Sequence, residues 1–278
     1  MTFWAALLAL LWDQLVPLFR PGQLDRLFGR YADWMHDRFN AGTPSHGLLA
    51  WLVAVAPIVL AVWLVEAWLA ALAWPLGLAW SALVLYRCLG FRQVVDLARG
   101  LADTLVEPDR ARDPLAVLGV HEQAAGIPGM LAREVMDRLF ELGLRRLFGV
   151  LFWFAVLGGA GAAAYAMTQL VAERWPGDEA FHATIRRVVA TFDWLPARAL
   201  AFSFALVGNF EEAMLAWRAN AGAGAEDETS VVRLAGYGAL GLGEEPASAD
   251  YVAGVAGLFN RAALLWLAVL GLLWLGMR

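Results

Sequence analysis

Residues 147–171 read LFGVLFWFAVLGGAGAAAYAMTQLV, an apolar run without a charged side chain. A helix needs about 20 apolar residues to cross the hydrocarbon core of a bilayer, so this run is long enough for one crossing. Its middle is rich in Gly and Ala, which would let another helix approach closely. We therefore expect a membrane span at 147–171 that offers a contact surface to a second copy of the chain or to another membrane protein.

The composition also indicates that lipid is part of the solvent. Hydrophobic residues make up 60% of the chain and charged residues only 17%, whereas a soluble domain is nearer to about 45–50% apolar. The 14 Trp residues fit the same interpretation, because indole favours the membrane–water interface. A net charge of −5 without a basic stripe argues against nucleic acid as a partner. A single cysteine, Cys88, excludes an internal disulfide.

Further apolar stretches predict additional spans in the lipid bilayer. They are residues 2–19, 47–71, 75–89 and 257–277, and AWPLG at 73–77 supplies the break between the second and the third. Residues 196–217 contain a shorter apolar core, 199–207, which is about half a bilayer long. We expect 196–217 to be a half-span or a helix packed against the bundle, with Pro196 in its first turn.

The arginines predict an orientation. Most of them lie in 19–46 and 90–146, which share one side of a five-span arrangement, so the positive-inside rule places both segments in the cytoplasm. Within 90–146, apolar residues recur at helical spacing, which predicts a lobe of amphipathic helices. The sequence thus predicts an all-α, polytopic integral membrane helical bundle, a single domain over 1–278, with a cytoplasmic helical lobe at 90–146. We expect a multi-pass protein of the bacterial inner (cytoplasmic) membrane.

Polar residues crowd both ends of 196–217, and polar groups at the ends of a half-span are typical of ligand sites in membrane proteins. The ligand-binding candidates there are Asp193, Arg198, Asn209, Glu211, Glu212 and Arg218. Asp193 would also cap the helix that begins beside Pro196, and Arg198 would extend along the apolar surface toward water. Arg145 and Arg146, just ahead of 147–171, either follow the positive-inside preference or contact a phosphate or an anionic lipid.

Two other pairs of polar residues stand out. His121 and Glu122 are adjacent, and such a pair could bind a metal or move a proton, although a solvated loop is the simpler interpretation. Asp13 and Glu66 lie inside expected spans and should face protein or water rather than lipid. We predict no metal site and no cofactor, since the sequence has no HExxH, GxSxG, CxxC or P-loop pattern.

Several longer stretches resemble one known family. FDWLPARALAFSFALVGNFEEAMLAWRA at 192–219, followed by AGYGALGLG at 235–243, resembles the C-terminal half of the CobD/CbiB family. FRQVVDLARGLADTLVEPDRARDPLAVLG at 91–119 and LFGVLFWFAVLGGAGAAAYAM at 147–167 are similar to its middle part. The likeness covers nearly the whole chain and looks closest to the AmpE-like branch.

What the resemblance implies for function depends on the positions at which this chain differs from the family's motifs. Enzymes of the family join an aminopropanol or its phosphate to adenosylcobyric acid during cobalamin assembly. Their polar and acidic motifs correspond here to LGVHEQ (118–123), ELGLRRLFG (141–149), MTQLV (167–171) and RRVVATFDW (186–194), which lack the family's metal-binding carboxylates. The resemblance therefore implies a regulatory or signalling protein like AmpE, linked to β-lactamase induction and cell-wall recycling, rather than an enzyme.

Two alternatives stay open. An ATP-dependent, amide-forming synthase of cobalamin biosynthesis would need Mg²⁺ and ATP, with ligands among Glu122, Asp193, Glu211 and Glu212. A small-molecule membrane carrier would line its path with Asp13, Glu66 and residues 193–212.

Overall fold

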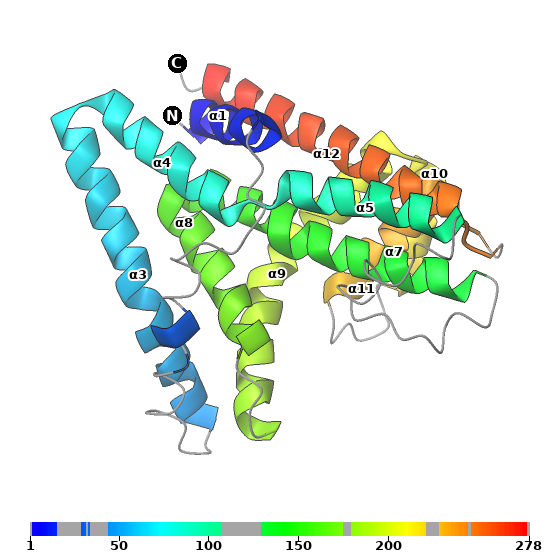
Figure 1. The fold of residues 1–278 in the computed structure, drawn as a ribbon, viewed down its shortest axis with the longest axis horizontal. Helices are drawn as coiled ribbons and strands as arrows, with labels where there is room; N and C mark the ends of the chain where they lie inside the picture. Colours follow the sequence, from blue (N-terminus) through cyan, green and yellow to red (C-terminus); the bar gives the residue numbers. More distant parts are fainter. Residues whose placement is uncertain are drawn as a thin grey trace. The chain divides into compact units, whose positions relative to one another are not determined.

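The computed structural model describes residues 2–15, 29–31, 33, 44–106, 129–174, 179–220, 228–243 and 246–276. All regular secondary structure in these residues is helical (Figure 1), which confirms the all-α prediction. The chain divides into two compact units. The first unit comprises residues 1–90, 149–193 and 273–278, and the second comprises 91–148 and 194–272.

Among the described residues, the first unit has five long helical segments. They are α1 (Thr2–Leu15), α3 (Pro44–Leu72), α4 (Trp74–Cys88), α8 (Gly149–Arg174) and the part of α9 (Glu179–Val207) that precedes residue 194. α3 packs against α4 and α8, and α4 also contacts α1 and α8. Where α3, α8 and α9 share a core, small side chains such as Ala50 and Ala54 are fully buried, and the Trp51 indole N–H donates to Thr168 Oγ1 at 3.1 Å.

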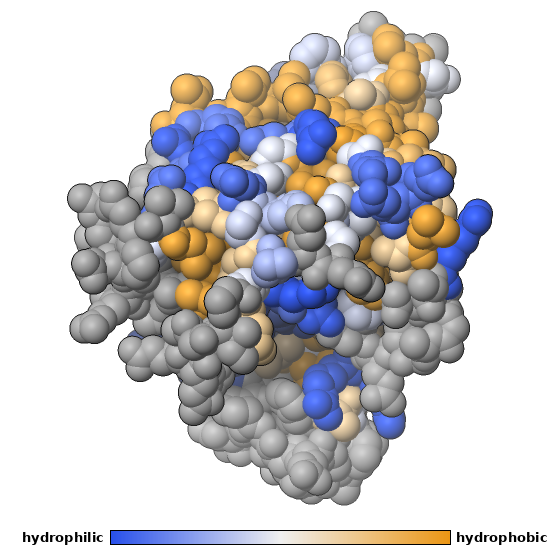
Figure 2. All heavy atoms as spheres, turned by 90° about the vertical axis from the view of Figure 1, so that its right-hand side faces the viewer, coloured by the Kyte–Doolittle hydropathy of each residue, from blue (hydrophilic) through white to orange (hydrophobic). Residues whose placement is uncertain are grey.

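The second unit contains the helices that the amphipathic pattern predicts. Its segments are α5 (Phe91–Val106), α7 (Met130–Gly143), the π-helical turn η3 (Leu144–Phe148), residues 194–207 of α9, α10 (Phe210–Asn220), α11 (Glu228–Leu240) and most of α12 (Ala249–Gly276). On α5, Val94, Ala98 and Leu101 are buried, as the helical spacing requires. Figure 2 views the right-hand side of Figure 1 and shows hydrophilic side chains gathered in patches among apolar ones.

Aromatic rings fill the interior of the second unit. Phe140, Phe148, Phe204 and Phe259 are fully buried, and their ring centroids lie 5.8–6.3 Å apart. Offset and edge-to-face contacts at this spacing are favourable beyond the area that they bury. The Trp266 ring lies against Phe148, and its N–H donates to Ser203 Oγ at 2.8 Å.

Three stretches of helix in the described part of the chain are long and apolar enough to cross a membrane: Gly47–Leu72, Met130–Arg174 and Ala249–Gly276. α1 and α4 have 14 and 15 described residues, fewer than the roughly 20 that a crossing needs, and the spans expected at 2–19 and 75–89 stay predictions. Large apolar side chains face outward, among them the rings of Trp4, Trp12, Trp63, Trp68, Trp74 and Trp194. An outer surface of this kind suits lipid rather than water.

The run at 147–171 is not one uninterrupted helix. Gly158 has φ 67° and ψ −153°, a backbone conformation that essentially only Gly adopts, so α8 breaks there into 149–157 and 159–174. A Cβ on Gly161 would lie 2.2 Å from the Trp153 carbonyl oxygen, so the second half packs directly on the first. The stretch expected to span the membrane at 147–171 lies within the long apolar stretch Met130–Arg174, and its Gly-rich middle contains a break that the sequence analysis does not predict. Contact of this middle with another chain stays a prediction.

α3 contains an internal proline whose missing hydrogen bond is replaced from a distant part of the chain. Pro57 has no N–H to donate to the carbonyl of Val53, four residues earlier. The Tyr31 hydroxyl donates to that same oxygen at 3.0 Å. The proline is therefore accommodated within a long apolar helix without leaving its acceptor unsatisfied.

α9 repeats the arrangement and differs from the predicted helix at 196–217. It begins at Glu179, so Pro196 lies in its interior rather than in its first turn. The carbonyl that Pro196 leaves without a donor is that of Phe192, and the Trp153 indole N–H donates to it at 3.1 Å. The sequence analysis places Pro196 in the first turn of a helix, because the donor that replaces its missing hydrogen bond, the Trp153 indole N–H, is distant in the sequence.

The stretch 196–217 is also divided at its other end. α9 ends at Val207, and α10 begins at Phe210. A Cβ on Gly208 would lie 2.6 Å from the Ala239 carbonyl oxygen of α11, and the Asn209 N–H donates to that oxygen at 3.0 Å. The close approach of α11 thus requires glycine at the junction and ends the helix there.

Candidate functional site

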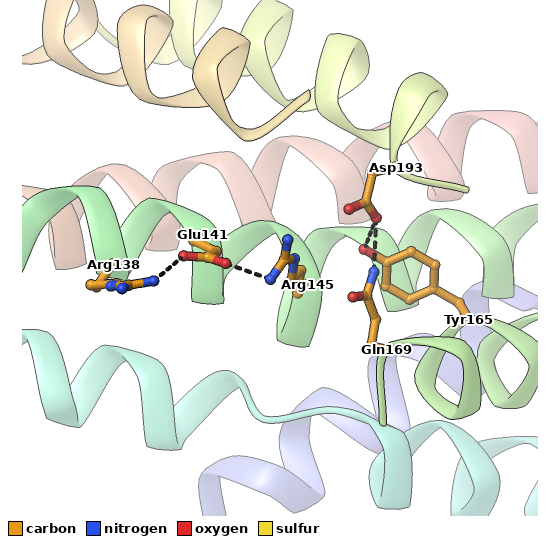
Figure 3. Close-up of polar contacts among 6 residues, drawn as sticks. All are labelled: Arg138, Glu141, Arg145, Tyr165, Gln169 and Asp193. Carbon is orange, nitrogen blue, oxygen red and sulfur yellow. Dashed lines mark hydrogen bonds and ion pairs between the residues drawn. The ribbon is translucent and has the colours of Figure 1, made fainter. Parts of the chain in front are cut away.

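In the second unit, charged side chains that contact one another line α7 and the π-helical turn that follows it. Glu141 accepts hydrogen bonds from two arginines: Arg138 at 3.0 Å and Arg145, which lies in η3 (Figure 3). The Glu141 side chain is 24% exposed and that of Arg145 29%, so the pair is partly shielded from water. π-helical turns of this kind are found frequently at functional sites.

A second carboxylate stands one turn earlier on α7. Asp137 accepts a hydrogen bond from the Tyr237 hydroxyl of α11 and lies 3.4 Å from an Arg233 guanidinium nitrogen. The Arg133 guanidinium lies over the Tyr237 ring, 5.1 Å from its centroid. Burial, and after it the hydrogen bond to Asp137, raises the pKa of the Tyr237 phenol above its ordinary value.

These seven residues form two neighbouring groups of contacts along α7, which we call the α7–α11 polar row: Arg138, Glu141 and Arg145 in one, and Arg133, Asp137, Arg233 and Tyr237 in the other. Four of the α7 and η3 positions, 133, 137, 141 and 145, recur every four residues and so line one side of the helix. The row holds four guanidinium groups and two carboxylates. Arginines that are oriented by carboxylates are suited to bind phosphate or carboxylate groups of a ligand.

The row also bears on metal binding. No group of three or more His, Cys, Asp or Glu side chains close enough to hold a metal ion occurs among the described residues. Mg²⁺ in nucleotide enzymes is bound through one or two carboxylates together with the phosphates of the substrate. Asp137 and Glu141 fit that smaller requirement.

Asp193 has a different environment from the one that we predicted. It is 3% exposed, and its Oδ1 accepts hydrogen bonds from Tyr165 Oη at 2.6 Å and from Gln169 Nε2 at 2.9 Å, both on α8 (Figure 3). It does not cap a helix, because α9 begins 14 positions earlier, at Glu179. Such a buried carboxylate with two donors fixes α9 against the second half of α8.

Arg198, which we expected to extend along the apolar surface toward water, is partly exposed and has specific contacts within the second unit. Its guanidinium lies over the Trp194 ring at 4.2 Å and pairs with Glu228 of α11 at 2.6 Å. The Glu228 side chain is only 9% exposed. This contact ties α9 to α11 within the second unit.

The other candidates around 209–218 occupy the ends of α10. The Asn209 Oδ1 accepts the N–H of Glu212 at 3.4 Å, Glu211 and Glu212 are in the first turn, and Arg218 is in the last. Acidic residues at the start and a basic one at the end complement the helix dipole. These side chains do not converge with the α7–α11 polar row in any contact that we observe, and a ligand-binding role for them stays a prediction.

The two acidic residues expected inside spans belong to the first unit. Asp13 is 1% exposed on α1. Glu66 of α3 accepts a hydrogen bond from Ser81 Oγ at 2.7 Å and lines a cavity of about 80 Å³. Asp13 and residues 193–212 are not among the residues that line that cavity. His121 and Glu122 lie outside the described residues, and Arg146 is exposed in η3.

The sequence analysis overlooked the acidic residues of α7. The stretch ELGLRRLFG (141–149), which corresponds to the family's acidic motif, contains one carboxylate, Glu141, at its start. The upstream stretch MLAREVMDRLFELG (130–143) places Asp137 and Glu141 four residues apart on the helix. That spacing was visible, but the α11 partners Arg233 and Tyr237 lie about a hundred positions away and could not be paired with it.

Comparison with known proteins identifies the family. The model described as CobD/Cbib protein matches residues 6–242. The chain is 31% identical over 227 residues to the Cobalamin biosynthesis protein CobD of Stutzerimonas stutzeri, covering 77% of this chain and 73% of the relative. It is 28% identical over 203 residues to the protein of the same name from Chromobacterium violaceum, covering 70% and 63%. No solved structure matches the chain.

These relatives overturn one expectation. Both carry a cobalamin-biosynthesis name, and nothing in the comparisons points to AmpE-like signalling or β-lactamase induction. The regulatory interpretation depended on missing carboxylates, and the acidic residues of α7 weaken that premise. The helical membrane chain therefore belongs to the CobD/CbiB family.

Proposed function

We propose that this chain is an enzyme of cobalamin biosynthesis that forms an amide bond between adenosylcobyric acid and an aminopropanol or its phosphate. The family match over residues 6–242 carries the proposal. The second unit supports it, because the α7–α11 polar row offers the guanidinium groups and carboxylates that a reaction of carboxylates and phosphates requires.

Within this proposal the residues of the row have distinct tasks. Arg138 and Arg145 bind an anionic group of a substrate, and Glu141 orients both guanidinium groups by accepting a hydrogen bond from each. Arg233 and Tyr237 hold Asp137 in place. When Mg²⁺ and ATP are bound, they supply activation of the carboxylate, and Asp137 and Glu141 are the residues that would hold the metal.

The proposal includes a location. The described residues include three stretches of helix long enough to cross a membrane, and the second unit also contains charged helices such as α5. The arginine-rich segments 19–46 and 90–146 are cytoplasmic under the positive-inside rule. We propose a multi-pass protein of a bacterial inner membrane whose polar row faces the cytoplasm, where water-soluble substrates arrive.

The test is a product assay with the full chain in detergent. Purified protein is incubated with adenosylcobyric acid, ATP, Mg²⁺ and either aminopropanol or its phosphate, and the amide product is measured by mass spectrometry. We expect product from the wild-type chain and at least a tenfold loss with Glu141→Gln, which corresponds to about 1.4 kcal/mol of transition-state stabilisation. Asp96→Asn is the control, because Asp96 is an exposed carboxylate on α5 that also pairs with two arginines.

The outcomes separate the function from the site. No product from folded wild-type protein, under conditions in which a CobD relative is active, would reject the proposed reaction. Product formation with Glu141→Gln equal to that with Asp96→Asn would keep the reaction and reject the polar row as its site. Thermal unfolding of each variant checks that lost activity does not come from lost structure.

A further inference from the structure

A cavity in the first unit is independent of the polar row. It measures about 80 Å³ and is lined by residues of α1, α3, α4 and α8. A water molecule needs roughly 10–15 Å³ of such space, so the cavity has room for a small ion with a few waters. Its polar groups are the Glu66 carboxylate and the hydroxyls of Ser81 and Thr2.

Glu66 and Ser81 lie side by side on the wall of this cavity. A serine hydroxyl has one proton to donate. Ser81 Oγ lies 2.7 Å from Glu66 Oε1 and 2.9 Å from the Gly77 carbonyl oxygen, so that proton satisfies only one of the two acceptors at a time. A carboxylate that is partly removed from water is stabilised by pairing with a positive charge or by coordinating a metal ion.

The break in α8 borders the same cavity. Phe154 and Gly158 are among its lining residues, and a Cβ on Gly159 would lie 2.9 Å from Glu66 Oε2. The half-helix 149–157 ends here, and the last carbonyls of a helix lack intrahelical donors. Interrupted helices in membrane proteins supply such carbonyls as ligands for alkali-metal ions.

We propose that this cavity binds one hydrated alkali-metal cation, with the Glu66 carboxylate and Ser81 Oγ as ligands. The charge fixes the class of ion. The cavity offers one carboxylate, which balances a single positive charge, whereas Ca²⁺ and Mg²⁺ sites use several oxygens with more carboxylate charge. An alkali-metal ion accepts hydroxyl and carbonyl oxygens as its remaining ligands.

The cation also explains why Glu66 is tolerated on an apolar helix. Its neighbours along α3 include the exposed rings of Trp63 and Trp68, which face the lipid side of the molecule. A carboxylate within a membrane span is costly unless it is paired or faces a water-filled space. A bound cation provides the pairing and holds α3, α4 and the α8 break together.

The first experiment measures the cation dependence of stability. Thermal unfolding of the full chain in detergent is followed by circular dichroism in NaCl, KCl and N-methylglucamine chloride at equal ionic strength. We expect Tm to rise with Na⁺ and to saturate; at ten times the Kd the bound, folded form is favoured about elevenfold over the ion-free one. Equal Tm values in all three salts at every concentration would overturn the proposal.

The variants locate the effect. Glu66→Gln should abolish the Na⁺ dependence, Ser81→Ala should move its midpoint to higher Na⁺, and Asp96→Asn on the exposed side of α5 should leave it unchanged. A Na⁺ dependence that persists in Glu66→Gln overturns the assignment. Because Glu66→Gln could fail to fold, binding of ²²Na⁺ to the wild-type chain is measured as well, and a stoichiometry of zero rather than one ion per chain also rejects the site.

Discussion

The hydroxyl of Tyr31 offers a direct test of how this chain tolerates proline inside an apolar helix. Tyr31→Phe removes the donor to the Val53 carbonyl and leaves the ring in place. Pro57→Ala restores an N–H four residues after Val53, which can donate to the same oxygen within α3. Tyr31→Phe therefore removes a donor to the Val53 carbonyl oxygen, and Pro57→Ala adds one.

The size of the effect follows from the contact. A hydrogen bond of this kind contributes about 0.5–1.5 kcal/mol net, and an orphaned buried acceptor costs about 1–3 kcal/mol. The contact is only partly buried, so we expect Tyr31→Phe to lower the free energy of unfolding by about 1 kcal/mol. In the Pro57→Ala background the same substitution should cost close to nothing, which gives a coupling energy of about 1 kcal/mol.

The assay is a double-mutant cycle. Wild type, both single variants and the double variant are unfolded with SDS in mixed micelles, and the transition is followed by circular dichroism. Independent sites add to within about 0.3–0.5 kcal/mol, so a coupling energy below that range would refute the compensation. Trp153→Phe with Pro196→Ala repeats the test on α9, where the acceptor is the Phe192 carbonyl.

Three further predictions concern backbone, buried charge and pH. Gly158→Ala should lower the free energy of unfolding by about 1–3 kcal/mol. Gly100→Ala in α5, where an added Cβ meets no neighbour within 4 Å, should raise it by up to about 1 kcal/mol. If both substitutions changed the free energy of unfolding in the same direction in the SDS titration, the break at Gly158 would be contradicted. Tyr165→Phe removes one donor from Asp193 and should cost about 1.5–3 kcal/mol in the same assay, and a loss under about 0.5 kcal/mol would contradict a charged, structural Asp193. The raised pKa of Tyr237 means that the folded chain keeps a proton that the unfolded chain releases above about pH 10. Stability should therefore be complete below that pH and fall as the pH rises above it, and Tyr237→Phe should flatten this alkaline decline in thermal unfolding.

The features of this chain that could be predicted are those that depend on the spacing of apolar residues along one segment. The buried face of α5 follows from Val94, Ala98 and Leu101, and α3 agrees closely with the apolar run at 47–71. The break at Gly158 was missed because hydropathy does not distinguish a glycine that adopts φ 67° from one inside a helix. The local hydropathy pattern gives the composition and the periodicity of a helix, but it does not give the backbone conformation of a single glycine.

The site was harder to predict because its partners are distant in the sequence. Asp137 meets Tyr237 and Arg233 across about a hundred residues, and Asp193 meets Tyr165 and Gln169 on another helix. Asp193 was expected at a helix start, since Pro196 usually marks one. Only the packing of α8 against α9 reveals that the carboxylate is buried and that the proline is internal.

The tryptophan side chains occupy two kinds of environment, so their fluorescence can report the depth of helices in a membrane. Trp63, Trp68 and Trp74 point outward near the end of α3 and the start of α4, whereas Trp51 and Trp266 have their indole N–H groups occupied by hydroxyl oxygens of the protein. Brominated lipids quench indole emission on contact, so the first group should dim according to bromine position along the acyl chain while the second stays bright. In a variant whose other tryptophans are replaced by phenylalanine, the depth profile of that quenching for Trp63, Trp68 and Trp74 would measure how α3 and α4 lie in the bilayer.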